Sequence, residues 1–202
     1  MAHLAHYREA HPMPFVITHW INLVAMLLLI VTGFCIHFPF WPYFMGIARG
    51  VHVFCGFVLF INCIARVAMA FFVKSSPTGG TREQVMDYKT WLPQADNRHQ
   101  GIHWIRYYLF LKKDHPLSAK LGVPQKISYL AIPLLIIVMF YTGLALWNPT
   151  MNLGFFAAGT DLVGGLMSMR IIHYFMMYVF ICFMFIHVYL ANIEGISPTL
   201  LM

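Results

Sequence analysis

The feature that most constrains this chain is a set of four apolar stretches, each long enough to cross a membrane. A helix needs roughly 20 residues to span a hydrocarbon core of about 30 Å. Of the 202 residues, 60% are hydrophobic and only 10% are charged, which is too apolar for the surface of a water-soluble domain of this size. Because lipid offers the backbone no hydrogen-bond partners, each stretch must be helical. The expected spans are 15–38, 51–73, 127–147 and 171–193.

These spans predict an all-α integral membrane protein, a four-helix bundle forming a single domain over residues 1–202. A longer segment, 74–126, separates the second span from the third. It contains "HWIRYYLFLKK", in which aromatic and basic residues recur at helical spacing. Such a segment suits a helix lying at the level of the lipid headgroups, so we expect 74–126 to be interfacial rather than a soluble domain.

The basic residues orient the chain. Nine lysines and arginines lie in 74–126 and Arg8 lies on the same side, whereas only Arg49 and Arg170 lie on the other. The positive-inside rule therefore predicts that both termini and the 74–126 segment are cytoplasmic. The formal net charge of +6 is then explained by contact with anionic lipid, and no nucleic-acid partner is required.

Two short patterns occur twice, at corresponding places in the two halves of the chain. The second span opens with "RGVHVF" (49–54) and the fourth with "RIIHYF" (170–175), both R-x-x-H-x-F. The first span ends with "TGFCIHFP" (32–39) and the third with "TGLALWNP" (142–149), both with proline six residues after the glycine. This repetition predicts two similar helical hairpins.

The repeat places four histidines at two depths. His173 and His187 lie fourteen residues apart on one span, a helical rise of about 21 Å, so they share roughly one face near opposite membrane surfaces. His19 starts the first span at the depth of His187, and His52 starts the second at the depth of His173. We therefore predict two histidine pairs, one near each surface.

Two glycines fit the same arrangement. Gly33 lies fourteen residues after His19 and so faces the same way at the outer depth, and Gly143 takes the corresponding place on the third span. A missing side chain at this level on both helices leaves room for a flat, bulky group between the outer histidines. Small residues also allow helices to pack closely, which is the alternative explanation.

Imidazole binds several metals, so histidine pairs do not name one by themselves. A zinc site normally needs four ligands and a di-iron site needs carboxylates, which the four spans lack. Two histidines from two helices match a bis-histidine haem, because the porphyrin supplies the other four ligands. The sequence has no CxxCH motif for covalent attachment, so we predict two b-type haems.

Three arginines are candidates for contacts with haem propionates. Arg49 and Arg170 each precede an outer histidine by three residues on the same helix face, although they could also meet an acidic partner surface or extend to the membrane interface. Arg66 stands within a span, fourteen residues after His52. An ionisable residue in a span is a functional candidate, and we expect a haem carboxylate as its counter-ion.

The order of "THW" in the first span, "RGVHVF" in the second and H-x13-H in the fourth resembles the di-haem cytochrome b subunits of membrane-bound nickel-iron hydrogenases. The related gamma subunits of respiratory formate dehydrogenases share it. The resemblance covers nearly the whole chain and implies a multi-pass protein of the bacterial cytoplasmic membrane. It implies haem ligation by the second and fourth spans outside and the first and fourth inside. The implied axial ligands are His19, His52, His173 and His187.

The resemblance also implies a role. Electrons would pass from an outer iron-sulfur small subunit, itself bound to a large catalytic hydrogenase subunit, through both haems to menaquinone or ubiquinone near the cytoplasmic face. This chain would be an electron-transfer subunit and membrane anchor without a catalytic pocket of its own. Besides Arg66, the quinone-site candidates are the polar residues expected near the inner haem: Asn22, Gln125, Tyr129 and Asn192.

Other functions remain open at this stage. A quinol-oxidising cytochrome b subunit of a formate dehydrogenase or a thiosulfate-type reductase would use the same haems with reversed electron flow. A transporter that relays protons through histidines is a different class, but it would need acidic or polar groups at mid-membrane, and these spans have few. A stand-alone reductase is disfavoured because the chain has no flavin or nicotinamide fingerprint.

Overall fold

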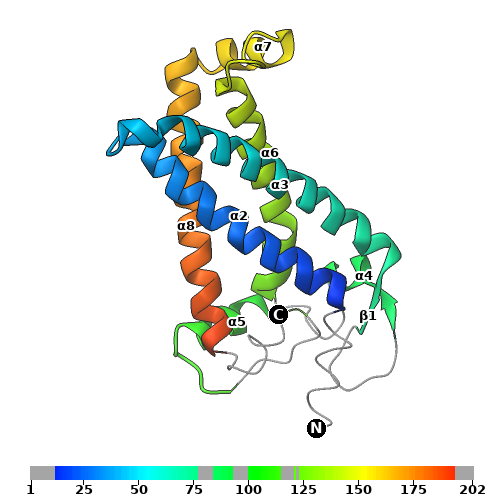
Figure 1. Cartoon of the computed structure of the whole chain (residues 1–202). Helices are drawn as coiled ribbons and strands as arrows, with labels where there is room; N and C mark the ends of the chain where they lie inside the picture. Colours follow the sequence, from blue (N-terminus) through cyan, green and yellow to red (C-terminus); the bar gives the residue numbers. More distant parts are fainter. Residues whose placement is uncertain (1–11, 77–83, 93–99, 115–120, 122, 194–202) are drawn as a thin grey trace. The chain divides into compact units, whose positions relative to one another are not determined.

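The computed structural model describes all residues except 1–11, 77–83, 93–99, 115–120, 122 and 194–202. Four long helices dominate this part of the chain (Figure 1), and each is long and apolar enough to cross a membrane. The four predicted spans and the all-helical class are therefore confirmed. The helices are α2 (Met13–His37), α3 (Met45–Phe72), α6 (Val123–Leu146) and α8 (Leu166–Ile193).

The chain divides into two compact units. The first unit comprises Met1–Trp20, Cys63–Pro133 and Leu190–Met202, and the second comprises Ile21–Asn62 and Leu134–Tyr189. Each long helix contributes one end to each unit. In α6 the division falls at Pro133, which has no backbone N–H to donate to the helix, so the hydrogen-bond ladder is interrupted there.

The second unit shows the predicted repetition in its helix boundaries. Helix α3 begins at Met45, seven residues before His52, and α8 begins at Leu166, seven residues before His173. The connections differ. A 3-10 helix, η1 (Pro42–Phe44), joins α2 to α3, whereas α7 (Gly154–Leu162) lies across the connection from α6 to α8, as Figure 1 shows.

Helix α7 was not predicted from the sequence. The Tyr141 hydroxyl of α6 donates a hydrogen bond to the Phe155 carbonyl of α7 at 3.0 Å, and the tyrosine ring also packs against Phe156. The chain then turns into α8 through Gly164 and Gly165, whose φ angles of +90° and +105° are left-handed and favour glycine. The hydrogen bond and ring contacts to Tyr141 tie α7 to the end of α6.

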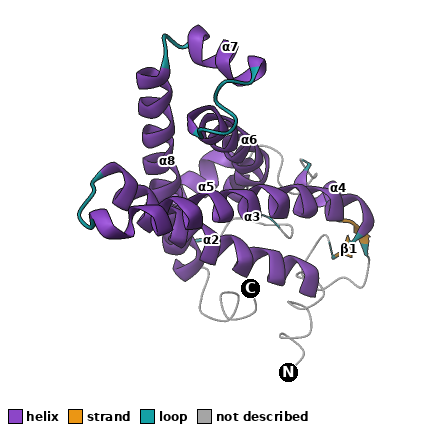
Figure 2. Ribbon diagram, turned by 45° about the horizontal axis from the view of Figure 1, so that its top comes forward, coloured by secondary structure: helices purple, strands orange, loops and turns teal. Residues whose placement is uncertain are grey.

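In the first unit, the segment between α3 and α6 contains short elements. Strands β1 (Lys74–Ser75) and β2 (Val85–Met86) pair antiparallel, with Lys74 opposite Met86. Figure 2 shows this strand pair beside the helices. Two-residue strands are too short to leave a periodic pattern, so the sequence did not predict them. The described part of the segment also contains two short helices, α4 (Tyr88–Trp91) and α5 (Gly101–Tyr108).

Helix α5 arises from the aromatic and basic stretch singled out in the sequence. It buries Trp104 and Tyr108 on one side and exposes Ile102 and Ile105 on the other. The expected helix is therefore present over the first part of this stretch, and residues 109–113 lie beyond its end. Its position at the headgroup level stays a prediction.

The long helices keep large apolar side chains on their exposed surfaces and polar ones inside. Val31, Ile61, Leu134 and Phe185 are each more than half exposed. Apolar surface of this extent is unfavourable in water but suits contact with lipid chains. Buried polar side chains on the same helices include Thr32, Asn62 and Thr142.

Candidate functional site

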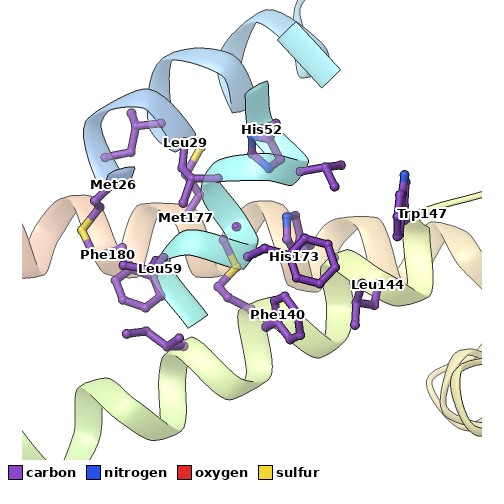
Figure 3. A pocket seen from close by; sticks show the side chains of 17 residues that line it. Met26, Leu29, His52, Leu59, Phe140, Leu144, Trp147, His173, Met177 and Phe180 are labelled. Carbon is purple, nitrogen blue, oxygen red and sulfur yellow. The ribbon is translucent and has the colours of Figure 1, made fainter. Parts of the chain in front are cut away.

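His52 on α3 and His173 on α8 face one another in the second unit. Their ring centroids are 6.2 Å apart and their planes are inclined at 66°. Both imidazoles line one cavity, which Figure 3 shows from close by. The rest of the labelled lining is apolar. It comes from all four long helices and from Trp147, which directly follows α6: Met26, Leu29, Leu59, Phe140, Leu144, Trp147, Met177 and Phe180.

The spacing of the two rings suits a shared metal. A bond between a metal and an imidazole nitrogen is about 2.0–2.1 Å long, and the ring centre lies roughly 1 Å behind that nitrogen. Two imidazoles that bind one metal from opposite sides therefore have centres roughly 6 Å apart, close to the observed 6.2 Å. The His52 and His173 side chains fit the bis-histidine ligation expected of a b-type haem.

Each of these histidines is held by a threonine of the preceding long helix. Thr32 Oγ1 on α2 lies 2.9 Å from His52 Nδ1, and Thr142 Oγ1 on α6 lies 2.8 Å from His173 Nδ1. Both threonines are buried. The internal repeat therefore extends to a side-chain hydrogen bond that is built in the same way in both hairpins.

The hydroxyl hydrogen bonds determine which imidazole nitrogen carries the proton. A hydroxyl has one proton to donate, and Thr32 donates it to the Leu28 carbonyl at 2.6 Å. The Thr32 oxygen must then accept a proton from His52 Nδ1, which leaves Nε2 with a free lone pair. The second hairpin repeats this, since Thr142 donates to the Val138 carbonyl at 2.9 Å. In this arrangement Nε2 of both imidazoles is free to bind a metal.

The two glycines lie directly against the histidines. A Cβ atom at Gly143 would be 3.3 Å from His173 Cε1, and one at Gly33 would be 3.4 Å from His52 Cε1 and 3.4 Å from Met177 Sδ. Both positions are tight for a methyl group. Gly143 also lines the cavity. The glycines therefore admit the imidazole rings themselves, a more specific reason than the general clearance expected from the sequence.

Arg66 forms a buried ion pair in the first unit. Its Nη2 lies 2.8 Å from Asp87 Oδ2, and its guanidinium stacks over the Phe15 ring at 3.8 Å. The rings of Trp91 and Tyr129 each lie 5.3 Å from the same guanidinium carbon. Asp87 is itself fixed by hydrogen bonds from Ser75 Oγ at 2.7 Å and Trp91 Nε1 at 3.1 Å.

A second polar contact joins two long helices of the second unit. Asn62 Nδ2 on α3 donates to Asn22 Oδ1 on α2 at 2.6 Å. Asn62 is buried and Asn22 is half-buried. Hydrogen bonds of this kind hold helices together in apolar surroundings, where an unpaired amide is costly.

Residues 10–200 match the family model described as prokaryotic cytochrome b561. The chain belongs to the prokaryotic cytochrome b561 family. Two curated relatives are each described as "Probable Ni/Fe-hydrogenase B-type cytochrome subunit". The relative from Azotobacter chroococcum mcd 1 is 28% identical and the one from Rhizobium leguminosarum bv. viciae 27%, each over 91% of this chain. The alignments cover 79% and 80% of the two relatives.

Membership of this family confirms the membrane cytochrome b class predicted from the histidine pattern. The cofactor of the cytochrome is b-type haem, of which the family binds two. Because haem iron carries electrons, the function of this chain is electron transport. The four apolar helices agree with a prokaryotic membrane protein.

The structure shows one of the two predicted pairs of haem ligands. It brings His52 and His173 together, as described. His187 belongs to the second unit, where its ring stacks on Phe183 with centroids 5.7 Å apart, whereas His19 belongs to the first unit. The pairing of His19 with His187 stays a prediction.

The arginines and quinone candidates differ in what surrounds them. Arg49 and Arg170 are exposed, one turn before their histidines. The structure pairs Arg66 with Asp87 and places Tyr129 beside this pair, and the contact of Arg66 with a haem carboxylate stays a prediction. Asn22 pairs with Asn62, as described above. Gln125 and Asn192 are exposed residues of the first unit.

Sequence reasoning missed four residues of these sites. Thr32 and Thr142 were visible as the repeated T-G pair, but the repeat does not show which groups their hydroxyls contact. Asn62 is an amide within a span, a type of residue that often bonds a neighbouring helix. Asp87 lies in the 74–126 segment without any motif, so no sequence signal pointed to it.

Proposed function

We propose that this cytochrome is the membrane anchor and electron-transfer subunit of a nickel-iron hydrogenase. It would accept electrons from an iron-sulfur subunit on the outer side and deliver them to menaquinone or ubiquinone near the cytoplasmic face. Family membership supports the cytochrome role, and the names of both relatives support the hydrogenase partner. The excess of basic residues in 74–126 supports an orientation with both termini in the cytoplasm.

The observation that carries this proposal is the facing pair His52 and His173 in an apolar cavity. We assign these two residues as the axial ligands of the outer haem, and His19 and His187 as those of the inner haem. When bound, a haem contributes a reversible one-electron change at its iron. The chain contributes neutral imidazole ligands, their orientation by threonine, and an apolar lining that excludes water.

The outer surface of the second unit suits contact with the donor subunit. Arg49 and Arg170 are exposed one helical turn before His52 and His173, at the start of α3 and α8. At this position they can pair with haem propionates or with acidic groups of the iron-sulfur subunit. The contact with acidic groups would bring the donor close to the outer ligand pair.

The quinone site is proposed on the cytoplasmic side. The candidates there are Asn22, Gln125, Tyr129 and Asn192, together with Arg66. Tyr129 lies beside the Arg66 guanidinium, so these two residues already share one polar cluster in the first unit. If quinone takes its protons from the cytoplasm while electrons arrive from outside, the transfer separates charge across the membrane without pumping.

The partner and the electron donor are tested together in membranes. An affinity-tagged chain is expressed in its native host, and purified complexes are assayed for co-purifying subunits and for reduction of the b bands. We expect the hydrogenase small and large subunits to co-purify, and hydrogen to reduce bands that added quinone reoxidises. Reduction by formate but not by hydrogen, or reduction only by added quinol, would contradict the hydrogenase assignment and favour the alternative respiratory complexes.

A further inference from the structure

The two threonines that contact the histidines have a role that the ligand assignment does not itself explain. We propose that Thr32 and Thr142 are positioning residues that fix the tautomer of both outer axial ligands and thereby lower the midpoint potential of the outer haem. This inference rests on the proposed assignment of His52 and His173 as the ligands of one haem.

The contact between threonine and imidazole occurs in both hairpins. The distances from hydroxyl to Nδ1 are 2.9 Å in the first hairpin and 2.8 Å in the second. In both, the threonine is followed by the glycine that lets the imidazole approach its helix. A threonine with a purely structural role would not need the contact with a histidine, because its hydroxyl already donates to a carbonyl of its own helix.

Each threonine hydroxyl has a second carbonyl of its own helix beside it. Thr32 Oγ1 lies 3.3 Å from the Leu29 carbonyl oxygen and Thr142 Oγ1 lies 3.0 Å from that of Met139, three residues before each threonine. A carbonyl only accepts, so these backbone groups draw the single hydroxyl proton toward the helix. The hydroxyl oxygen is then left to accept from the imidazole, which acts as the donor.

These hydrogen bonds should lower the midpoint potential of the haem. A ligand imidazole that donates from Nδ1–H to an acceptor becomes a more basic ligand at Nε2. A more basic axial ligand stabilises ferric over ferrous iron, and hydrogen bonding around the ligands is a recognised determinant of haem potential. Both axial ligands of this haem donate such a hydrogen bond to a threonine. Their effects on its midpoint potential therefore add in the same direction.

The two hydroxyls also hold the ring planes in place. The rings are inclined at 66° to one another, and each is hydrogen-bonded to a different helix, α2 for His52 and α6 for His173. Without the hydroxyl, each ring could rotate about its own side-chain bonds. Loss of either threonine should therefore alter the angle between the rings as well as the ligand basicity.

The test uses valine, which keeps the branched shape of threonine but removes the hydroxyl. Thr32→Val, Thr142→Val and the double variant are purified with their haems and titrated potentiometrically, with the ferric form examined by electron paramagnetic resonance. Thr32→Ser and Thr142→Ser keep the hydroxyl. Thr160→Val is the matched control, because Thr160 is a buried helical threonine whose hydroxyl bonds the Phe156 carbonyl at 2.9 Å.

We expect full haem content with an upward shift in the midpoint potential of one haem in each valine variant, and a larger shift in the double variant. The other haem should not change. The serine variants and Thr160→Val should titrate like the unmodified chain. Valine variants that keep both haems at unmodified potentials would overturn the inference.

If the valine variants lose haem, the serine variants show whether the missing hydroxyl is the cause. Recovery of haem with serine would support the requirement for a hydroxyl, whereas continued loss with serine would contradict it. An unmodified chain that purifies without haem is a different failure, because it would contradict the assigned ligands rather than the role of the threonines.

Discussion

The imidazoles of His52 and His173 lie with their centroids 6.2 Å apart and their planes at 66°, each hydrogen-bonded through Nδ1 to a threonine of another helix. The sequence separates these residues by 121 positions, and two helical hairpins bring them to one cavity. This relationship leads to testable consequences for spectra, for stability and for haem content.

The angle between the rings predicts a spectroscopic signature. In low-spin ferric haem, near-parallel axial imidazoles give an ordinary rhombic resonance, whereas strongly inclined planes give a highly anisotropic signal with a large maximum g value. At 66° we expect the outer haem to show the anisotropic signal in low-temperature electron paramagnetic resonance. The signal should disappear in His52→Ala, and two rhombic signals in the unmodified chain would contradict the observed ring geometry.

A methyl group at Gly143 should disturb the outer ligand pair. The added Cβ would lie 3.3 Å from His173 Cε1, so the ring must shift to accommodate it. Overpacking of this kind costs about 1–3 kcal/mol. We expect Gly143→Ala to lower haem retention during purification, measured as the ratio of haem to protein.

Gly50→Ala is the control for Gly143→Ala. Gly50 also lies in a long helix, α3, but a Cβ there would meet nothing within 4 Å. Alanine favours a helix over glycine by about 1 kcal/mol, so this variant should keep its haem and unfold at an equal or higher temperature. Equal haem retention in Gly143→Ala and Gly50→Ala would show that the close approach to His173 is unimportant.

Removing the charge of Asp87 should destabilise the first unit. The Arg66 side chain is only 15% exposed and Asp87 only 1%, so Asp87→Asn leaves a mostly buried guanidinium without its counter-ion. Breaking such a pair from one side costs about 3 kcal/mol. We expect a clear fall in the thermal unfolding midpoint in detergent, and none in the exposed control Asp161→Asn. Similar midpoints in the two variants would contradict the importance of the pair.

The amide contact between Asn62 and Asn22 should contribute to helix association. Asn62→Ala removes the donor 2.6 Å from Asn22 Oδ1, which should cost about 1–2 kcal/mol in apolar surroundings. A double-mutant cycle with Asn22→Ala measures the coupling directly. The effects on the unfolding midpoint should be less than additive, and strict additivity would show that the two amides act independently.

The long helices could be predicted because an apolar run of about 20 residues has few alternatives to a membrane helix. Their ends could not. Helix α3 begins at Met45, whereas the span was expected from residue 51, because its first turns contain Arg49 and lie outside the purely apolar stretch. Helix α7 was missed because its nine residues form a short apolar run that carries no boundary signal.

The histidine pair could be predicted because helical geometry converts sequence spacing into depth and face. The contacts around it depend on how each helix is rotated against its neighbour, which spacing alone does not determine. Thr32 and Thr142 were therefore visible as a repeat without a known partner. Asp87 could not be linked to Arg66 at all, because the strand pair and the turn that carry it to α3 have no periodic pattern.

The most direct test of the central claim is the haem content of histidine variants, determined by pyridine extraction and by reduced-minus-oxidised spectra. The unmodified chain should hold two haem b. The double variant His52→Ala/His173→Ala should still hold one, because we assign both residues to the same haem, whereas His52→Ala/His187→Ala should hold none. Loss of both haems in the first double variant, or a colourless unmodified chain, would contradict the account.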